Sequence, residues 1–256
     1  MVTTTGIKRD LIEIIESFSI GEVLDFEEKY DGQFHALKYL YSKIGVPEIF
    51  VFLVVLNALS SYQLSCIGER YWWEFSRYFS QNPPPLYRLP EAFIGFLRSS
   101  DCNRRLIEQK TRRVGRVAPV VRKRIRNIDW LVKNQRDFVS EIAKALESSL
   151  DAKTIAFSAK MLNYALRIIT RRKFPAPRSI PIPVDSRIMK ISKKLEISNP
   201  RAFWTDISKH CGIPPLHIDS LLWTGLRLAR ENIGLSLLDN KTRSLVVFLR
   251  KNILEK

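Results

Sequence analysis

The chain has 256 residues, with 42 lysines and arginines against 26 aspartates and glutamates, a formal net charge of +16 and a pI near 9.9. Hydrophobic residues make up 45% and charged residues 27%, a balance that excludes an intrinsically disordered chain and allows one or two domains. The positive charge favours a polyanionic partner, nucleic acid before a membrane surface, although a basic surface kept only for solubility has the same composition.

The cysteines and histidines narrow the chemistry further. Cys66, Cys102 and Cys211 are odd in number and widely spaced, so they fit neither a disulfide framework nor a CxxC metal site. We therefore expect reduced thiols in an intracellular compartment. The three scattered histidines argue against a zinc site, and we expect no metal or other cofactor.

No segment resembles a membrane anchor or a signal peptide. The N-terminal segment has acidic residues early and no long apolar run. The most apolar run, 49–59, has about half the length that spans a bilayer, so it predicts a buried helix.

Helical periodicity dominates the chain and alternating strand patterns are scarce, which predicts an all-α protein. The proline-rich stretch 80–90 predicts a stiff, extended connector. We expect two helical lobes, one of about 1–80 together with the C-terminal helices and one of about 90–195. Helices are predicted near 8–18, 20–30, 33–42, 48–65, 68–80, 90–99, 137–149, 152–170, 186–195, 200–211, 214–231 and 240–254.

The predicted helix 152–170 carries two lysines on one face. Asp151 could cap this helix, which places Lys153 in its first turn, and Phe157 and Lys160 follow on the same face. A cation in the first turn opposes the helix dipole, so Lys153 is a poor choice for stability alone and suits a nucleophilic amine. The structural alternative is an ordinary surface lysine.

Asp185 follows a proline-rich loop and is predicted to be the N-cap of the next helix. An ordinary cap would explain this residue. A capping carboxylate is also held ionised and oriented by backbone N–H groups, which suits a group that faces a developing cation. A lysine and an aspartate, each at a helix start, are what a Schiff-base-forming enzyme needs.

Two further signals point toward nucleic acid. Asp219 and Trp223 lie one turn apart on one predicted face, and an indole beside a carboxylate can stack a base and read its donors; a core tryptophan beside a capping aspartate is the alternative. The stretch 103–127 carries ten basic residues and one acid, Glu108, so it is either a solvated face or a surface that faces phosphates.

Several segments together resemble the archaeal 8-oxoguanine DNA glycosylase (AGOG) family, a branch of the helix-hairpin-helix glycosylases. They are KTIAFSAKMLNYA (153–165), IPIPVDSR (180–187) and GIPPLHIDSLLW (212–223), supported by DGQFHA (31–36) and the apolar and aromatic stretch 56–80. The resemblance runs from about 18 to 235. The segment SSLD (148–151) has the length of a hairpin turn but lacks the glycine of the wider superfamily.

The resemblance implies an all-α fold with a helix-hairpin-helix-like element and an active-site cleft between the two lobes. It implies that Lys153 is the catalytic lysine and Asp185 the catalytic aspartate, and the spacing 185 − 153 = 32 agrees with that family. Phe157 and Trp223 would sandwich a base flipped out of the duplex. The polar groups of the base pocket would be Gln33, Lys160 and Asp219.

The implied activity is that of a bifunctional 8-oxoguanine DNA glycosylase and AP lyase of base excision repair. 8-Oxoguanine differs from guanine by a proton on N7 and an oxygen on C8, so selectivity needs an acceptor for N7–H. Gln33 and a backbone carbonyl within 181–184 are both candidates. The partner would be double-stranded or single-stranded DNA that contains the lesion, bound by a monomer in the cytoplasm at the nucleoid, with no membrane involved.

Two rival functions remain open at this level. A non-catalytic helical protein could bind nucleic acid through 103–127, with salt-sensitive affinity for undamaged duplex and no strand cleavage. A glycosylase for another purine lesion would keep the mechanism and change only the base pocket.

Overall fold

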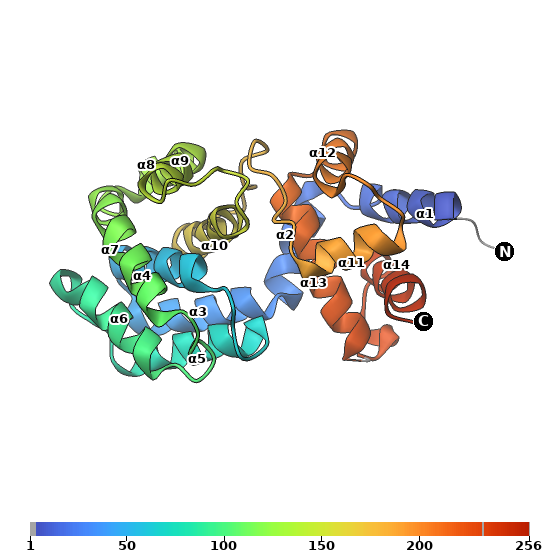
Figure 1. Cartoon of the computed structure of the whole chain (residues 1–256). Helices are drawn as coiled ribbons and strands as arrows, with labels where there is room; N and C mark the ends of the chain where they lie inside the picture. Colours follow the sequence, from blue (N-terminus) through green and yellow to red (C-terminus); the bar gives the residue numbers. More distant parts are fainter. Residues whose placement is uncertain (1–3, 232, 256) are drawn as a thin grey trace. The chain divides into compact units, whose positions relative to one another are not determined.

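The computed structural model describes residues 4–231 and 233–255, and within these residues it contains helices, turns and loops but no strand (Figure 1). The all-α prediction is therefore confirmed. None of the helices in the described part of the chain is long and apolar enough to cross a membrane.

The chain forms two compact units. The split unit joins the N-terminal residues up to Asp31 to the residues from Arg178 onward, and the central unit is Gly32–Pro177. These boundaries differ from the expected lobes of about 1–80 and 90–195. Residues 32–80 belong to the central unit because their helices pack on the long helix 153–170, and residues 178–195 belong to the split unit.

The split unit is built around one buried helix, α13. Its neighbour α14 packs closely because position 225 is a glycine: a Cβ there would lie only 2.8 Å from Cδ1 of Leu249. The apolar sides of the other helices of this unit share the same core. The elements of the unit are α1 (Thr4–Glu16), α2 (Ile20–Tyr30), α11 (Ser186–Lys194), α12 (Pro200–Cys211), α13 (Pro215–Arg230), η2 (Leu235–Leu237), α14 (Asn240–Leu249) and the π-helical turn η3 (Arg250–Leu254).

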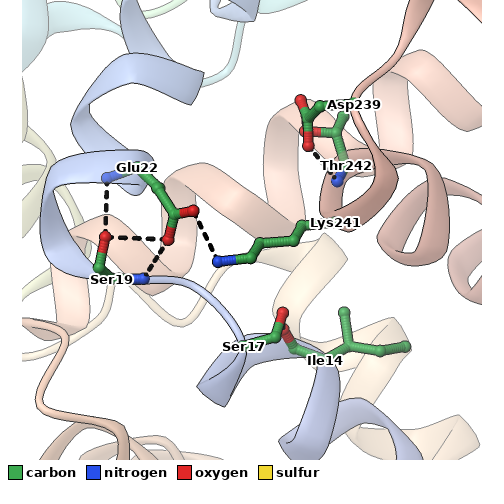
Figure 2. A network of polar contacts seen from close by, with 7 residues as sticks. All are labelled: Ile14, Ser17, Ser19, Glu22, Asp239, Lys241 and Thr242. Atoms are coloured by element: carbon green, nitrogen blue, oxygen red, sulfur yellow. Dashed lines mark hydrogen bonds and ion pairs between the residues drawn. The ribbon is translucent and has the colours of Figure 1, made fainter.

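Polar groups join the start of α2 to the start of α14 (Figure 2). Ser19 and Glu22 form a capping box: Oε2 of Glu22 accepts a hydrogen bond from the Ser19 amide at 2.7 Å, and Oγ of Ser19 accepts one from the Glu22 amide at 3.3 Å. Nζ of Lys241 lies 2.6 Å from Oε1 of the same Glu22, while Asp239 caps α14 by accepting from the Thr242 amide at 2.9 Å. The ion pair between Lys241 and Glu22 therefore joins the start of α14 to the start of α2.

The central unit has the apolar helix α4 at its core. Residues 49–60 of this helix are all buried, and it packs against α3, α6, α7 and α10. It ends at Ser60, not near 65, and the proline-rich connector is shorter than predicted because a 3-10 turn begins at Leu86. The elements of the unit are α3 (Gly32–Ile44), α4 (Pro47–Ser60), α5 (Gly68–Gln81), η1 (Leu86–Arg88), α6 (Leu89–Ser99), α7 (Ile107–Arg124), α8 (Ile128–Lys133), α9 (Gln135–Ala145) and α10 (Lys153–Thr170).

A disulfide joins Cys66 to Cys102, so the expectation of three reduced cysteines was wrong. The two residues lie 36 apart in sequence, in loops that meet only in the folded chain, where the Ser65 amide also donates to the Cys102 carbonyl at 2.8 Å. An odd count and a wide spacing cannot reveal such a pairing. Cys211 is a free cysteine. The cysteine argument for a reducing compartment therefore fails for this pair.

The turn between α9 and α10 forms without glycine. Glu147 adopts a left-handed conformation with φ of 50°, and the amides of Glu147 and Ser148 donate to the carbonyls of Lys144 and Ala143 at 3.0 and 2.9 Å. This is a Schellman motif with glutamate at the position that glycine usually occupies. The chain thus builds the expected hairpin of helices with a different residue at its turn.

Candidate active site

Lys153 is the first residue of α10 and its side chain is exposed. The N-cap of this helix is Ala152, so the expectation that Asp151 caps it was wrong. Asp151 lies one residue too early and accepts a hydrogen bond from the Ser149 hydroxyl. The lysine therefore stands at a helix start that has no side-chain cap from its own N-cap residue.

The face of α10 that begins with Lys153 continues inward through an aromatic ring to a buried lysine. Phe157 is half-buried and meets Trp72 edge to face, with ring centroids 6.1 Å apart. Lys160 is 2% exposed, and its Nζ lies 5.7 Å from the ring centroid of Tyr164. Lys160 is therefore not a solvated lysine, whereas Lys153 is exposed to solvent.

Gln33 is buried at the second position of α3, in the same unit as α10. The next residue, Phe34, contacts Tyr164 edge to face at 5.2 Å, and the guanidinium of Arg167 lies 5.3 Å from the Phe34 ring centroid. These contacts hold the start of α3 against α10. The central unit thus contributes four of the candidate residues: Gln33, Lys153, Phe157 and Lys160.

Asp185 is the N-cap of α11, as the sequence predicted. One carboxylate oxygen accepts hydrogen bonds from the amides of Arg187 and Ile188 at 2.8 and 3.0 Å. The other oxygen lies 3.7 Å from Nε of Arg187, and the Asp185 side chain is 12% exposed. The carboxylate is therefore oriented by its own helix and by a neighbouring cation.

Asp219 and Trp223 share one face of α13, one turn apart. Asp219 is buried and Trp223 is half-buried, and the guanidinium of Arg187 lies against the indole ring. Arg187 therefore contacts two of the predicted site residues, Asp185 and Trp223. The split unit contributes these three candidates: Asp185, Asp219 and Trp223.

Two residues beside the candidates were not predicted from the sequence. Arg187 stands in the segment IPIPVDSR, and Trp72 stands in the aromatic helix that follows α4. Both lie within segments that resemble the family, so their place in these segments could have indicated that they lie near the site. Their roles depend on contacts with Trp223 and Phe157, which lie far away in sequence.

The basic stretch 103–127 has more acidic partners than its own sequence offers. Most of it forms α7, and three of its arginines pair with carboxylates outside the stretch: Arg104 with Asp101, Arg116 with Glu147 and Arg124 with Glu141. Arg105, Arg112, Lys123 and Arg126 are exposed. The stretch is thus partly neutralised by the fold and partly available to phosphates.

Within residues 4–231 and 233–255, no three histidine, cysteine, aspartate or glutamate side chains are grouped so that they could hold a metal ion.

Comparison with known proteins identifies the family. A family model described as AGOG, N-glycosylase/DNA lyase, matches residues 12–247. The chain is 40% identical over 225 residues to the N-glycosylase/DNA lyase of Thermococcus kodakarensis, covering 86% of this chain and 84% of that protein. It is 37% identical over 215 residues to the one of Methanococcus maripaludis, covering 84% and 85%.

A solved structure shares the fold. The 8-oxoguanosine complex of Pa-AGOG, the 8-oxoguanine DNA glycosylase from Pyrobaculum aerophilum, aligns with a TM-score of 0.82 and 24% identity over 96% of both chains. From the family model and the two relatives, we conclude that the chain belongs to the AGOG family of N-glycosylase/DNA lyases and is a bifunctional DNA glycosylase and DNA lyase of base excision repair.

Proposed function

We propose that this enzyme excises 8-oxoguanine from DNA and then cleaves the strand, with Lys153 as the nucleophile and Asp185 as the catalytic carboxylate. The observation that carries the proposal is the pair of helix starts: an exposed Lys153 opens α10, and Asp185 caps α11 with its carboxylate held by two backbone amides. Both residues stand in segments that resemble the family.

In the first step, Nζ of Lys153 bonds to C1′ while the bond from C1′ to the base breaks, and that electron pair leaves with the base. Positive charge develops on the sugar as the base departs, and the Asp185 carboxylate stabilises it. The nitrogen on C1′ then gives up one proton. The C1′–O4′ bond breaks, its electron pair and a proton go to O4′, and the nitrogen lone pair forms a double bond to C1′, which gives a protonated Schiff base. A proton is then lost from C2′ and the 3′ phosphate leaves by β-elimination.

Base recognition requires that the purine be flipped out of the duplex, which costs a few kcal/mol. We assign Phe157 and Trp223 to stack on it, since stacking on an aromatic ring is worth about 1–3 kcal/mol per base. Gln33, Lys160 and Asp219 would meet its polar edges. The acceptor for N7–H is either Gln33 or a backbone carbonyl within 181–184.

The partner in this proposal is DNA with the lesion, in duplex or single-stranded form, bound by one copy of the chain at the nucleoid in the cytoplasm. The net charge of +16 and the exposed cations of α7 support binding to the phosphate backbone.

Borohydride trapping on an 8-oxoguanine oligonucleotide tests the nucleophile. The wild-type enzyme should form a covalent adduct, and Lys153→Gln should form none. Lys160→Gln is the matched control, because it removes the other lysine of the same helix face; it should still trap, with weaker recognition of the base. A wild-type enzyme that binds DNA without cleaving it would support a non-catalytic binding protein, and equal trapping by Lys153→Gln would place the nucleophile elsewhere.

Substrate choice is tested separately by comparing 8-oxoguanine with guanine and with other damaged purines in the same sequence. Preferential release of a different lesion would keep Lys153 and Asp185 in their roles and overturn only the assignment of the base.

A further inference from the structure

A cation from α7 contacts the first turn of α10. Nη2 of Arg113 donates a hydrogen bond to Oγ1 of Thr154 at 2.7 Å, and Thr154 is the residue directly after Lys153. All three residues belong to the central unit. Arg113 is therefore attached to the turn that carries the proposed nucleophile.

This contact occurs at a helix start that lacks its own side-chain cap. Ala152 is the N-cap and has no polar side chain, so the first turn is held by backbone hydrogen bonds, among them those from the amides of Ile155 and Ala156 to the Ala152 carbonyl. The first turn of an uncapped helix frays easily. The hydrogen bond from Arg113 instead holds the Thr154 side chain of this turn, without satisfying any of its free backbone N–H groups.

Arg113 is itself held in place by the loop after α4. Its guanidinium lies 5.8 Å from the ring centroid of Tyr62, whose hydroxyl donates to Gln109 at 3.1 Å. The buried Lys110 lies over the same ring at 4.7 Å and donates to Asn103. The disulfide between Cys66 and Cys102 closes this loop. The position of Arg113 is thus determined by the Tyr62 ring and by the hydrogen bond to Thr154.

Stability alone does not account for a cation at this place. Arg113 is half-buried, and no carboxylate among the described residues forms an ion pair with it. Its Nε is buried and, within the same part of the chain, has no hydrogen-bond partner. A cation near a helix N-terminus also opposes the helix dipole. A neutral donor such as glutamine would serve a purely structural role at lower cost.

We infer that Arg113 is a positioning residue for Lys153: through Thr154 it fixes the first turn of α10 and so the direction from which the amine approaches the sugar. This inference rests on the proposed role of Lys153. The expected effect of Arg113 on the rate comes from positioning the amine, because a nucleophile displaced by about 1 Å can lose roughly 100-fold in rate.

Thr154 offers a sharp test, because one substitution removes only the hydroxyl and another keeps it. Thr154→Val is isosteric and cannot accept the hydrogen bond, whereas Thr154→Ser can. The measurement is the single-turnover rate of borohydride trapping with enzyme in excess over a lesion-containing duplex, together with the Kd for that duplex. Arg98→Gln is the matched control, since it removes an exposed arginine from α6, a helix of the same unit that carries no candidate site residue.

Thr154→Val and Arg113→Gln should each slow trapping by about 10- to 100-fold, with Kd within about 3-fold of wild type. The double variant should be no slower than the slower single variant, because both remove one interaction. Thr154→Ser should stay within about 3-fold of the wild-type rate. Arg98→Gln should leave both the trapping rate and the Kd within about 3-fold of wild type, because it is an exposed surface substitution.

The inference is overturned if Thr154→Val traps at the wild-type rate, if the two substitutions multiply in the double variant, or if Thr154→Ser is as slow as Thr154→Val. Thermal melting of each variant separates loss of folding from loss of rate: a lower Tm with an unchanged rate also overturns it. Failure of the wild-type enzyme to trap would refute the proposed function instead, so the two failures are distinguishable.

Discussion

Nδ1 of His217 lies 2.7 Å from Oε1 of Glu27 in the core of the split unit, where the two residues are 1% and 0% exposed. His217 is on α13 and Glu27 is on α2. This contact fixes the helix that presents Asp219 and Trp223 against a helix from the other end of the chain.

The buried pair predicts a large loss of stability in His217→Ala. We expect the free energy of unfolding to fall by about 3–5 kcal/mol, because the substitution leaves a carboxylate in the core without its histidine partner. The matched control is His210→Ala: His210 pairs with Glu16, but its side chain is 65% exposed, so the expected loss is below about 1 kcal/mol. Urea denaturation of both variants measures the difference, and equal losses would contradict the prediction.

The capping box of α2 predicts a stability contribution that acid removes. Hydrogen bonds from Lys241 and Ser19 lower the pKa of Glu22 from 4.5 to about 2. Because the folded-state pKa lies below the unfolded one, the contribution is complete above about pH 4.5 and is lost as the pH falls toward 2.

Glu22→Gln should therefore lower the free energy of unfolding at neutral pH, by no more than about 1 kcal/mol since the Glu22–Lys241 pair is solvent-exposed. The difference from wild type should shrink through the same acid range. Melting curves across that range check it, with Glu13→Gln, on an exposed pair within α1, as the control. A difference that stays constant down to pH 2 would contradict this assignment.

Asp185→Asn should separate catalysis from folding. Asparagine caps a helix about as well as aspartate, so Tm should change little, whereas loss of the negative charge should slow base release by roughly 100-fold or more. Binding to lesion-containing DNA should change far less than the rate. Single-turnover base release and DNA affinity are the measurements. Asp185→Ala, which also removes the cap, should cost about 1 kcal/mol in addition. An Asp185→Asn variant with the wild-type release rate would exclude the catalytic role.

The disulfide predicts one free thiol in the native protein and a measurable loss of stability on its removal. Replacing Cys66 and Cys102 by serine should lower the free energy of unfolding by about 3–4 kcal/mol, for a loop that spans 36 residues.

The remaining thiol, Cys211, should alkylate slowly, because burial raises its pKa to about 11. Mass spectrometry of alkylated native protein counts the thiols. Three labelled cysteines without a reductant would contradict the pairing, and Cys211→Ser controls for the loss of a thiol.

The sequence by itself determined the all-α fold and the positions of most helices. Periodic apolar residues and local capping signals are sufficient for this, because a helix is decided mainly by residues within three or four positions of one another. Asp185 shows how far local chemistry reaches: its place before Ser186 and after two prolines predicted the cap that the structure has. Asp151 shows the limit, since the helix begins two residues later and leaves Ala152 as the cap.

Only the tertiary structure decided which distant residues meet. The pairing of Cys66 with Cys102, the contact of Arg187 with Trp223 and the hydrogen bond from Arg113 to Thr154 all join separate elements. No spacing rule relates such partners, because their approach depends on how whole helices pack. Lys160 makes the same point: its residue type predicts exposure, yet packing of α10 in the central unit leaves it 2% exposed. In the stretch 151–187, local sequence thus determines the helices. The residues that surround Lys153 and Asp185 are determined by how the two units fold.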